Sequence, residues 1–141
     1  MRCNWMLLSM MATVGFWASS CVAQTENVTE LVDGKVEQLA KGFKFTEGPA
    51  ADDYGNVYFT DIPNEHILIW TIGGELKIHR EKSGSANGLY FTATGSLLAC
   101  EGGARRLTSQ SPKGKIKVLT DTFGGGKYNS PNDLWSDKWG G

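Results

Sequence analysis

The chain is built from a repeat of about 40 residues, and this period constrains its fold more than any other feature. Gly34, Gly74 and Gly114 each open a short run in which apolar and polar residues alternate. Such alternation is typical of β-strands, whose side chains point to opposite faces in turn. A second series of turn glycines consists of Gly55, Gly95 and Gly140. Its spacing is the same, apart from five extra residues near positions 124–126. Self-similarity of this length is typical of repeat architectures.

Each repeat contains several short strand-like runs between its turns. The clearest runs cover residues 56–60, 66–70, 96–100 and 106–109. No stretch of more than ten residues after position 23 has a helical period. Four strands in about 40–45 residues are typical of one β-propeller blade. We therefore predict an all-β fold, a β-propeller made of four-stranded antiparallel sheets.

The number of repeats is small for this architecture. Residues 24–141 hold about two and a half repeats, whereas propellers close with ~4–8 blades. The run Val36–Leu39 precedes the first full repeat, in the manner of an outer strand that completes the last blade of a closed ring. We therefore expect residues 24–141 to be the N-terminal part of a propeller domain that is truncated at its C-terminus. The alternative is a complete, open protein of three repeats, which would leave sheet edges and apolar faces unprotected.

Residues 1–23 are expected to be a signal peptide. Arg2 precedes an apolar stretch from Trp5 to Ala18. This stretch is shorter than the ~20 residues of a membrane-spanning helix, but it matches the core of an export signal. Small residues lead up to Ala23, after which cleavage is expected. We therefore expect an exported protein, periplasmic or extracellular, without a stable membrane span; lipid attachment at Cys21 is the alternative.

Charge and cysteine content argue against two other kinds of function. The chain has 14 Lys and Arg residues against 15 Asp and Glu residues, so it has no basic excess with which to bind nucleic acid. Of its three cysteines, only Cys100 lies beyond the expected signal peptide, so the mature chain has no internal disulfide. Cys100 follows apolar residues and is expected to be a buried, inert thiol.

Three polar residues occupy the same position in successive repeats. Glu47, Asn87 and Asn132 each stand near the start of the innermost strand, which lines the channel of a propeller. We expect them to converge on one mouth of that channel. Carboxylate and amide oxygens are hard ligands that suit Ca²⁺ or a similar divalent cation. The alternative is that the Asn-Gly and Asn-Asp pairs serve only as turn residues.

Five short motifs carry a resemblance to a known family. In this order along the chain, they are similar to motifs of the gluconolactonase branch of the senescence-marker-protein (regucalcin)/gluconolactonase family. The similar region runs from about Lys41 to Asp137. The motifs are Phe45-Thr46-Glu47-Gly48-Pro49, Phe59-Thr60-Asp61-Ile62-Pro63-Asn64, Ala86-Asn87-Gly88-Leu89, Ala99-Cys100-Glu101 with Arg105-Arg106, and Asn129-Ser130-Pro131-Asn132-Asp133.

The resemblance implies a fold, an activity and a site. The fold is a six-bladed propeller with one divalent cation, often Ca²⁺, at the mouth of the channel. The activity is hydrolysis of a sugar lactone or a related ester, with the small-molecule lactone as substrate. Glu47 and Asn132 match metal ligands of the family, and Asn132 also lies beside the substrate. Asp133 accompanies Asn132 as a substrate-side residue, and Asn87 is expected to contact the substrate.

The chain departs from the family pattern in two ways. Gly102 stands where many members of this branch have His after the Cys-Glu pair. The remaining metal ligands and the general base of the family lie in later blades, so we assign no catalytic residue. Asp61 and Glu101 are expected to cap turns or to pair with neighbouring arginines. We therefore expect metal-dependent lactone hydrolysis only in the complete propeller; the alternatives are a non-catalytic binding propeller or an inactive fragment. A truncated chain of this kind is expected to self-associate.

The remaining conspicuous side chains are assigned to packing or to the surface. His66 and His79 have no second ligand at metal spacing and are expected to be surface residues. Two further sets have simple roles: Trp70, Trp135 and Trp139 are expected to pack between blades, and Lys113, Lys115 and Lys117 to form the solvated face of an outer strand.

Overall fold

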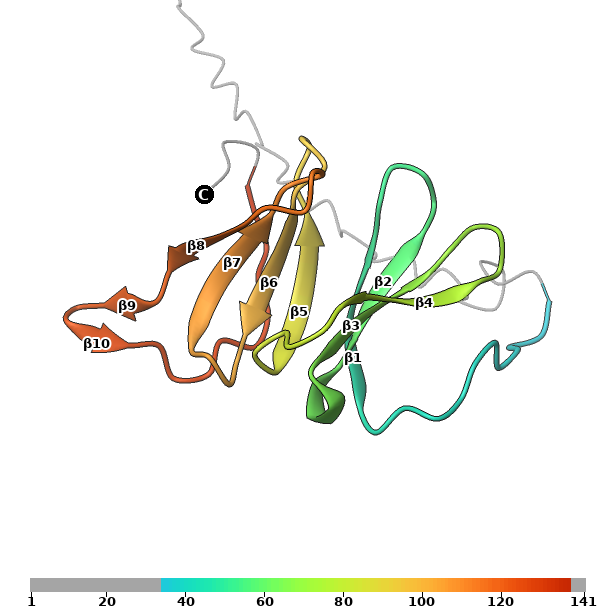
Figure 1. Cartoon of the computed structure of the whole chain (residues 1–141), viewed down its shortest axis with the longest axis horizontal. Coiled ribbons are helices and arrows are strands. Elements are labelled where there is room, and N and C mark those ends of the chain that lie inside the picture. Colours follow the sequence, from blue (N-terminus) through green and yellow to red (C-terminus); the bar gives the residue numbers. More distant parts are fainter. Residues whose placement is uncertain (1–33, 138–141) are drawn as a thin grey trace, which may run out of the picture. The chain divides into compact units, whose positions relative to one another are not determined.

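The computed structural model describes residues 34–137 and shows an all-β chain (Figure 1). All its strands lie in the compact unit that begins at Gln38. The expected signal peptide, with Cys21, lies outside the described residues, as does Trp139. Within the described range, no helix is long and apolar enough to cross a membrane.

Two four-stranded antiparallel sheets follow each other along the chain. We call the first sheet blade 1 and the second blade 2. Within each blade, neighbours in sequence are also neighbours in the sheet, so strand order equals chain order. Blade 1 contains β1 (Thr46–Ala51), β2 (Val57–Asp61), β3 (His66–Trp70) and β4 (Leu76–Arg80). Blade 2 contains β5 (Ala86–Phe91), β6 (Leu97–Glu101), β7 (Arg106–Gln110) and β8 (Ile116–Thr120).

The 40-residue period of the sequence recurs in the strand register. Thr46 pairs with Asp61 in blade 1, and Ala86 pairs with Glu101 in blade 2. The turns after β1 and β5 are also equivalent, because Gly55 and Gly95 both have positive φ angles, of 86° and 75°. A glycine adopts this conformation without the steric cost that other residues pay. The predicted blades of four antiparallel strands are therefore confirmed.

The third repeat and the first outer run differ from the expected strands. No strand is assigned to residues 128–137 or to Val36–Leu39, and Val36 is almost fully exposed. A strand is stabilised by hydrogen bonds to a neighbour, and neither segment has a sheet partner within the described range. The five extra residues of the sequence fall at a small hairpin of β9 (Thr122–Phe123) and β10 (Gly126–Lys127).

The core contains residues of β3 in blade 1 and of β5 and β6 in blade 2. Five buried residues form it: Ile67, Ala86, Leu89, Leu97 and Ala99. Tyr58 of β2 and Phe91 of β5 pack against this cluster. Their rings contact each other edge to face, with the ring centres 4.9 Å apart. Burying one large aliphatic side chain contributes ~1.5–3 kcal/mol, so this cluster is a main source of stability at the junction between the blades.

Two expectations about individual side chains are wrong. His79 is half-buried, and its ring packs edge to face on Tyr58 with the centres 4.9 Å apart. Trp135 is 76% exposed, because among the described residues no third four-stranded sheet covers it. The expected solvated face is confirmed, since Lys113, Lys115 and Lys117 are all exposed.

Candidate functional site

The predicted site residues lie at one end of the inner strands. Glu47 is the second residue of β1 and Asn87 is the second residue of β5. Both strands begin at the lower ends of their blades in Figure 1. Asn132 lies in the segment after the hairpin, next to β5, because its carbonyl oxygen accepts a 2.7 Å hydrogen bond from the Gly88 N–H. The three residues therefore belong to neighbouring segments, as their common phase in the repeats predicts.

Glycines allow these segments to approach closely. A Cβ atom on Gly48 would lie 2.1 Å from the carbonyl oxygen of Asn87. A Cβ atom on Gly88 would lie 2.3 Å from Oδ1 of Asp133. Both distances are far below van der Waals contact, so each glycine is required where one inner segment meets the next. The glycines that follow Glu47 and Asn87 thus decide how closely the three predicted site residues are spaced.

The two asparagines are hydrogen-bonded to each other. The side-chain amide of Asn87 donates to Oδ1 of Asn132, with 2.5 Å between the heavy atoms. Asn132 is exposed and Asn87 is half-buried. An amide oxygen has two lone pairs, so Oδ1 of Asn132 retains one acceptor position. This pairing directs both side chains to the same place at the end of the inner strands.

Glu47 and Asp133 differ in their surroundings. The Glu47 side chain is exposed, and within the described range it makes no hydrogen bond or ion pair. Oδ1 of Asp133 accepts a 2.8 Å hydrogen bond from the N–H of Leu134 and lies against Gly88. Glu47 is thus a carboxylate open to a ligand, whereas Asp133 is partly engaged by backbone.

Asp61 fixes the segment that leads into Glu47. It is 1% exposed, and its carboxylate accepts hydrogen bonds of 3.2 Å from the N–H groups of Lys44 and Phe45 and of 2.8 Å from the Asn64 amide. Burial by itself would raise the pKa of Asp61, but these hydrogen bonds outweigh burial and lower the pKa. Asp61 is therefore an ionised structural group that anchors the segment before β1. Its side chain does not cap the 3-10 turn Ile62–Asn64 that follows it, so the expected turn-capping role is wrong.

Glu101, the equivalent residue in blade 2, is fully buried in an ionic network. Arg80 of β4 donates to its Oε1, and Nε of Arg106 donates to its Oε2 at 2.6 Å. The hydroxyl of Thr108 also donates to Oε1, at 2.8 Å. The expected pairing with a neighbouring arginine is confirmed for Arg106. Because every oxygen is engaged and water is excluded, Glu101 is not available as a catalytic base.

Gly102, the position at which the resemblance leads one to expect His, has close neighbours. A Cβ atom on Gly102 would lie 2.9 Å from the Ser130 hydroxyl and 3.5 Å from the carbonyl oxygen of Pro131. A larger side chain would therefore require the segment before Asn132 to shift. The departure from the family pattern agrees with the local packing of this chain.

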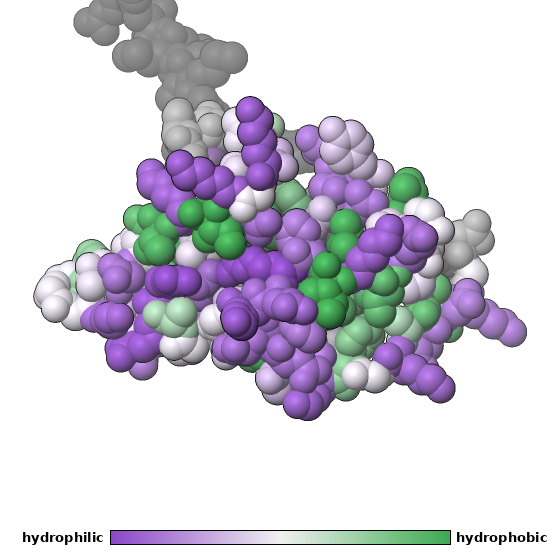
Figure 2. Space-filling model, viewed as in Figure 1, coloured by the Kyte–Doolittle hydropathy of each residue, from purple (hydrophilic) through white to green (hydrophobic). Residues whose placement is uncertain are grey.

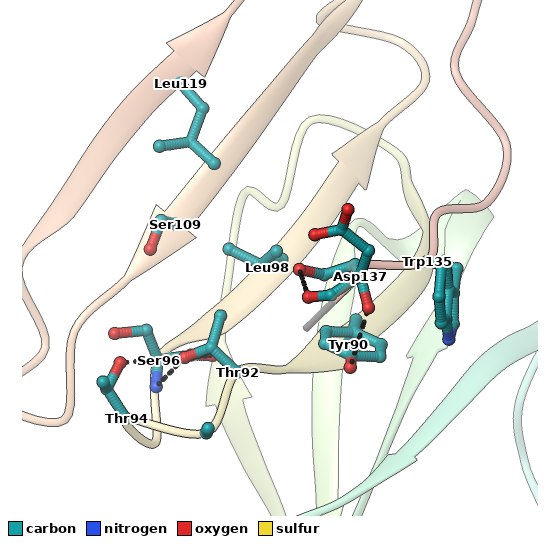
Figure 3. A pocket seen from close by; sticks show the side chains of 11 residues that line it. Tyr90, Thr92, Thr94, Ser96, Leu98, Ser109, Leu119, Trp135 and Asp137 are labelled. Atoms are coloured by element: carbon teal, nitrogen blue, oxygen red, sulfur yellow. Dashed lines mark hydrogen bonds between the residues drawn. The ribbon is translucent and has the colours of Figure 1, made fainter. Parts of the chain in front are cut away.

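A cavity of about 680 Å³ lies away from these residues. It is open to solvent on the face of blade 2 (Figure 3). Tyr90, Leu98 and Trp135 line it, together with several hydroxyl side chains. None of the predicted site residues contributes to it. Within residues 34–137, no group of three or more His, Cys, Asp or Glu side chains is placed to hold a metal ion.

Sequence reasoning missed the role of Thr60, which ends β2 next to Asp61 and pairs with Glu47. Thr60 stands 40 residues before Cys100, and this repeat offset was the available signal.

Comparison with known proteins places the chain in a family. Residues 45–141 match the family model described as the SMP-30/Gluconolactonase/LRE-like region. The chain belongs to this family. This result confirms the resemblance found in the five motifs, and it agrees with the β-propeller class of the fold.

Individual relatives include proteins described as gluconolactonases. A gluconolactonase of Zymomonas mobilis is 27% identical over an alignment of 124 residues, and the match covers 77% of this chain and 35% of that protein. The structure of a gluconolactonase from Xanthomonas campestris matches with a TM-score of 0.68 at 27% identity, over 72% of this chain and 35% of that one. A second structure, of a protein assigned to the gluconolactonases, matches with a TM-score of 0.69 at 36% identity, over 74% and 37% of the two chains.

A more distant structure shares the fold alone. It is a virginiamycin B lyase from Staphylococcus aureus, with a TM-score of 0.55 at 22% identity over 72% of this chain. Across all these matches, the chain spans slightly more than a third of the length of the relatives.

Proposed function

We propose that the protein hydrolyses a sugar lactone with the help of a divalent cation, and that residues 34–137 supply one part of its active site. The observation that carries this proposal is the meeting of three family-matched positions, Glu47, Asn87 and Asn132, at one end of adjacent inner segments. The family match over residues 45–141 supports the same activity.

The donor atoms at these positions suit Ca²⁺ as the cation. Glu47 offers an exposed carboxylate and Asn132 an amide oxygen with one free lone pair. Hard oxygen donors of this kind are the ligands that Ca²⁺ prefers, usually six to eight of them. The described residues would therefore hold the ion on one side. When bound, the cation would polarise the lactone carbonyl and lower the pKa of a bound water.

The side chains around the cation position have separate roles in this proposal. Asn87 orients the substrate, because its amide group can donate to a lactone oxygen once its bond to Asn132 is exchanged. Asp133 contributes negative charge beside Asn132. Asp61 and Glu101 hold backbone and arginine groups and take no part in proton transfer. The base that accepts the proton of water is therefore not assigned to either of them.

A lactone hydrolysis assay tests the proposal. The full chain and a longer form with further repeats, where one is encoded, are assayed on glucono-δ-lactone with Ca²⁺ and after chelation. We expect calcium-dependent hydrolysis only in the longer form, and its loss on Glu47→Gln. Glu75→Gln is the matched control, because Glu75 is an exposed carboxylate in a turn of blade 1. Hydrolysis that survives both chelation and Glu47→Gln would contradict the proposal.

A second candidate function is a non-catalytic binding propeller or an inactive chain. It is favoured by the absence, within residues 34–137, of a three-residue acidic or histidine cluster for a metal. The same assay separates the two, because a binding module would bind the lactone or its acid without turnover.

We also propose that the chain alone self-associates. Blade 1 has an apolar surface cavity of about 250 Å³ lined by Leu39, Ala40, Phe43, Val57, Phe59 and Trp70. Figure 2 shows apolar side chains on both blades, separated by hydrophilic ones. Exposed apolar surfaces of this kind favour association with a second copy.

A further inference from the structure

Thr60 of β2 lies at the junction between the two inner strands. Its side chain is fully buried, and its hydroxyl oxygen is 3.1 Å from the carbonyl oxygen of Glu47 and 3.2 Å from that of Asn87. We propose that Thr60 is a positioning residue: its hydroxyl holds the segments that carry Glu47 and Asn87 at a fixed separation. The consequence for ligand binding rests on the proposed function, whereas the positioning itself does not.

Both carbonyl groups lie where the ladder of their own sheet is interrupted. The β1–β2 register shifts between Glu47 and Ala50, and the β5–β6 register shifts between Ala86 and Leu89. A backbone carbonyl that loses its ladder partner needs another donor, and the buried Thr60 side chain lies beside both carbonyls. One O–H group shared between the two carbonyls meets this requirement and links blade 1 to blade 2.

The next junction along the chain achieves the same spacing by other means. Cys100 occupies the equivalent position, since it pairs with Leu107 as Thr60 pairs with Ile67. A thiol is a weak donor, and burial followed by the charge of Asp133 raises the pKa of Cys100 to about 11. At this junction the Gly88 N–H instead donates to the carbonyl of Asn132.

The backbones are also close at the first junction, because a Cβ atom on Gly48 would lie 2.8 Å from Cα of Gly88. There the Thr60 hydroxyl adds a link that the thiol of Cys100 supplies only weakly at the second junction. The position of Glu47 relative to Asn87 therefore depends on Thr60.

Two measurements on the full chain test the role of Thr60. The first is the nuclear Overhauser effect between the α protons of Gly48 and Gly88, which reports the separation of the two strands without any ligand. The second is the affinity for Ca²⁺ measured by calorimetry. We expect Thr60→Val, which removes only the hydroxyl, to weaken the proton contact and to lower the affinity about tenfold, as loss of a supporting hydrogen bond does at metal sites.

Two control variants separate positioning from general stability. Thr60→Ser keeps the hydroxyl and is expected to restore both the proton contact and the affinity. Thr108→Val removes a buried hydroxyl that donates to Glu101, so it lowers the melting temperature but leaves both measurements unchanged.

Failure of the Thr60 proposal can be distinguished from failure of the proposed function. If Thr60→Val keeps the Gly48–Gly88 contact and the wild-type calcium affinity, the proposal is overturned. If the wild-type chain binds no Ca²⁺, this part of the proposed cation site fails, and the proton contact alone decides the role of Thr60.

Discussion

Gly48 lies against the carbonyl oxygen of Asn87 so closely that a Cβ atom on Gly48 would be 2.1 Å from it. Gly88 has the same relationship to Asp133 and Asn132 in the next segment. In each case the residue that follows a predicted ligand has no side chain, which lets one inner segment pack on the next. Glu47-Gly48 and Asn87-Gly88 are therefore packing units as well as candidate ligands.

Gly48→Ala is expected to destabilise the fold more than an alanine substitution at another glycine that has a positive φ angle but open space around it. Gly74→Ala is the matched control, because Gly74 also has a positive φ angle but no neighbour near its Cβ position. The control should lose ~1–2 kcal/mol for the left-handed backbone. Gly48→Ala should lose a further ~1–3 kcal/mol, because the backbone of Asn87 must move. Urea unfolding measures both; equal losses would contradict the close packing.

Arg80→Met is expected to destabilise the chain strongly. Arg80 and Glu101 are both buried, so removing the arginine leaves the Glu101 carboxylate with fewer partners in a site without water. Breaking such a pair typically costs ~3–5 kcal/mol, reduced here because Arg106 and Thr108 remain. Lys77→Met is the control: it breaks the exposed pair with Glu75, which contributes little to stability because water and salt screen it. Thermal unfolding of the two variants should differ clearly.

His79 is expected to make the stability depend on pH. Burial against Tyr58, together with the charge of Arg80, lowers the pKa of His79, although Gln110 opposes this effect. The unfolded chain therefore binds a proton at a higher pH than the folded chain does. Stability should be full above the unfolded value of ~6.5 and should fall as the pH drops below it towards the lowered folded value.

The variant His79→Gln tests this assignment, since it removes the titrating group. Chemical unfolding between pH 7 and pH 5, a window spanning the ordinary histidine pKa of ~6.5, should show a weaker pH dependence for the variant. The Nε2 atom of His79 and Oε1 of Gln110 are buried in one cavity of about 130 Å³, and neither makes a well-aligned hydrogen bond among the described residues. An unchanged pH profile would assign the effect to other groups.

Self-association should depend on the apolar cavity of blade 1. The double substitution Leu39→Gln with Phe43→Ser places polar groups in this cavity and should lower the apparent mass in light scattering. Ile72→Gln is the control, because Ile72 is 78% exposed but lies in a turn outside the cavity. A wild-type chain that stays monomeric at all concentrations would contradict the proposal.

The expected export signal predicts a mature chain that begins at Gln24. Mass spectrometry of the chain expressed in a secreting host measures this end directly. Retention of Met1 would contradict export, and a lipid on Cys21 would support the alternative of membrane attachment.

The repeat predicted most of the fold because glycine turns and alternating strands are local signals. The runs 66–70 and 106–109 coincide with β3 and nearly with β7. The expected strands at Val36–Leu39 and after Pro131 did not form, although their alternation is similar. Alternation reports which face a strand would bury, but hydrogen bonding to a neighbour decides whether the strand exists.

The candidate site was predictable only in part. The common phase of Glu47, Asn87 and Asn132 predicted that they lie in neighbouring segments. The supporting roles of Thr60 and Asp61 depend on contacts to residues 13 to 27 positions away, such as Asn87 and Lys44. Composition and local periodicity carry no information on such contacts. His79 was misplaced for the same reason, because its aromatic neighbour belongs to another strand.

The link between Arg80 and Glu101 limits how far the repeats are modular. Arg80 ends the last strand of blade 1, whereas Glu101 ends the second strand of blade 2. A segment cut at the repeat boundary would separate these charges, so a single excised blade would not be an independent folding unit. Recombination between relatives, natural or engineered, should therefore succeed when both residues come from the same parent. The smallest exchangeable piece of this chain is then the pair of blades rather than one sequence repeat.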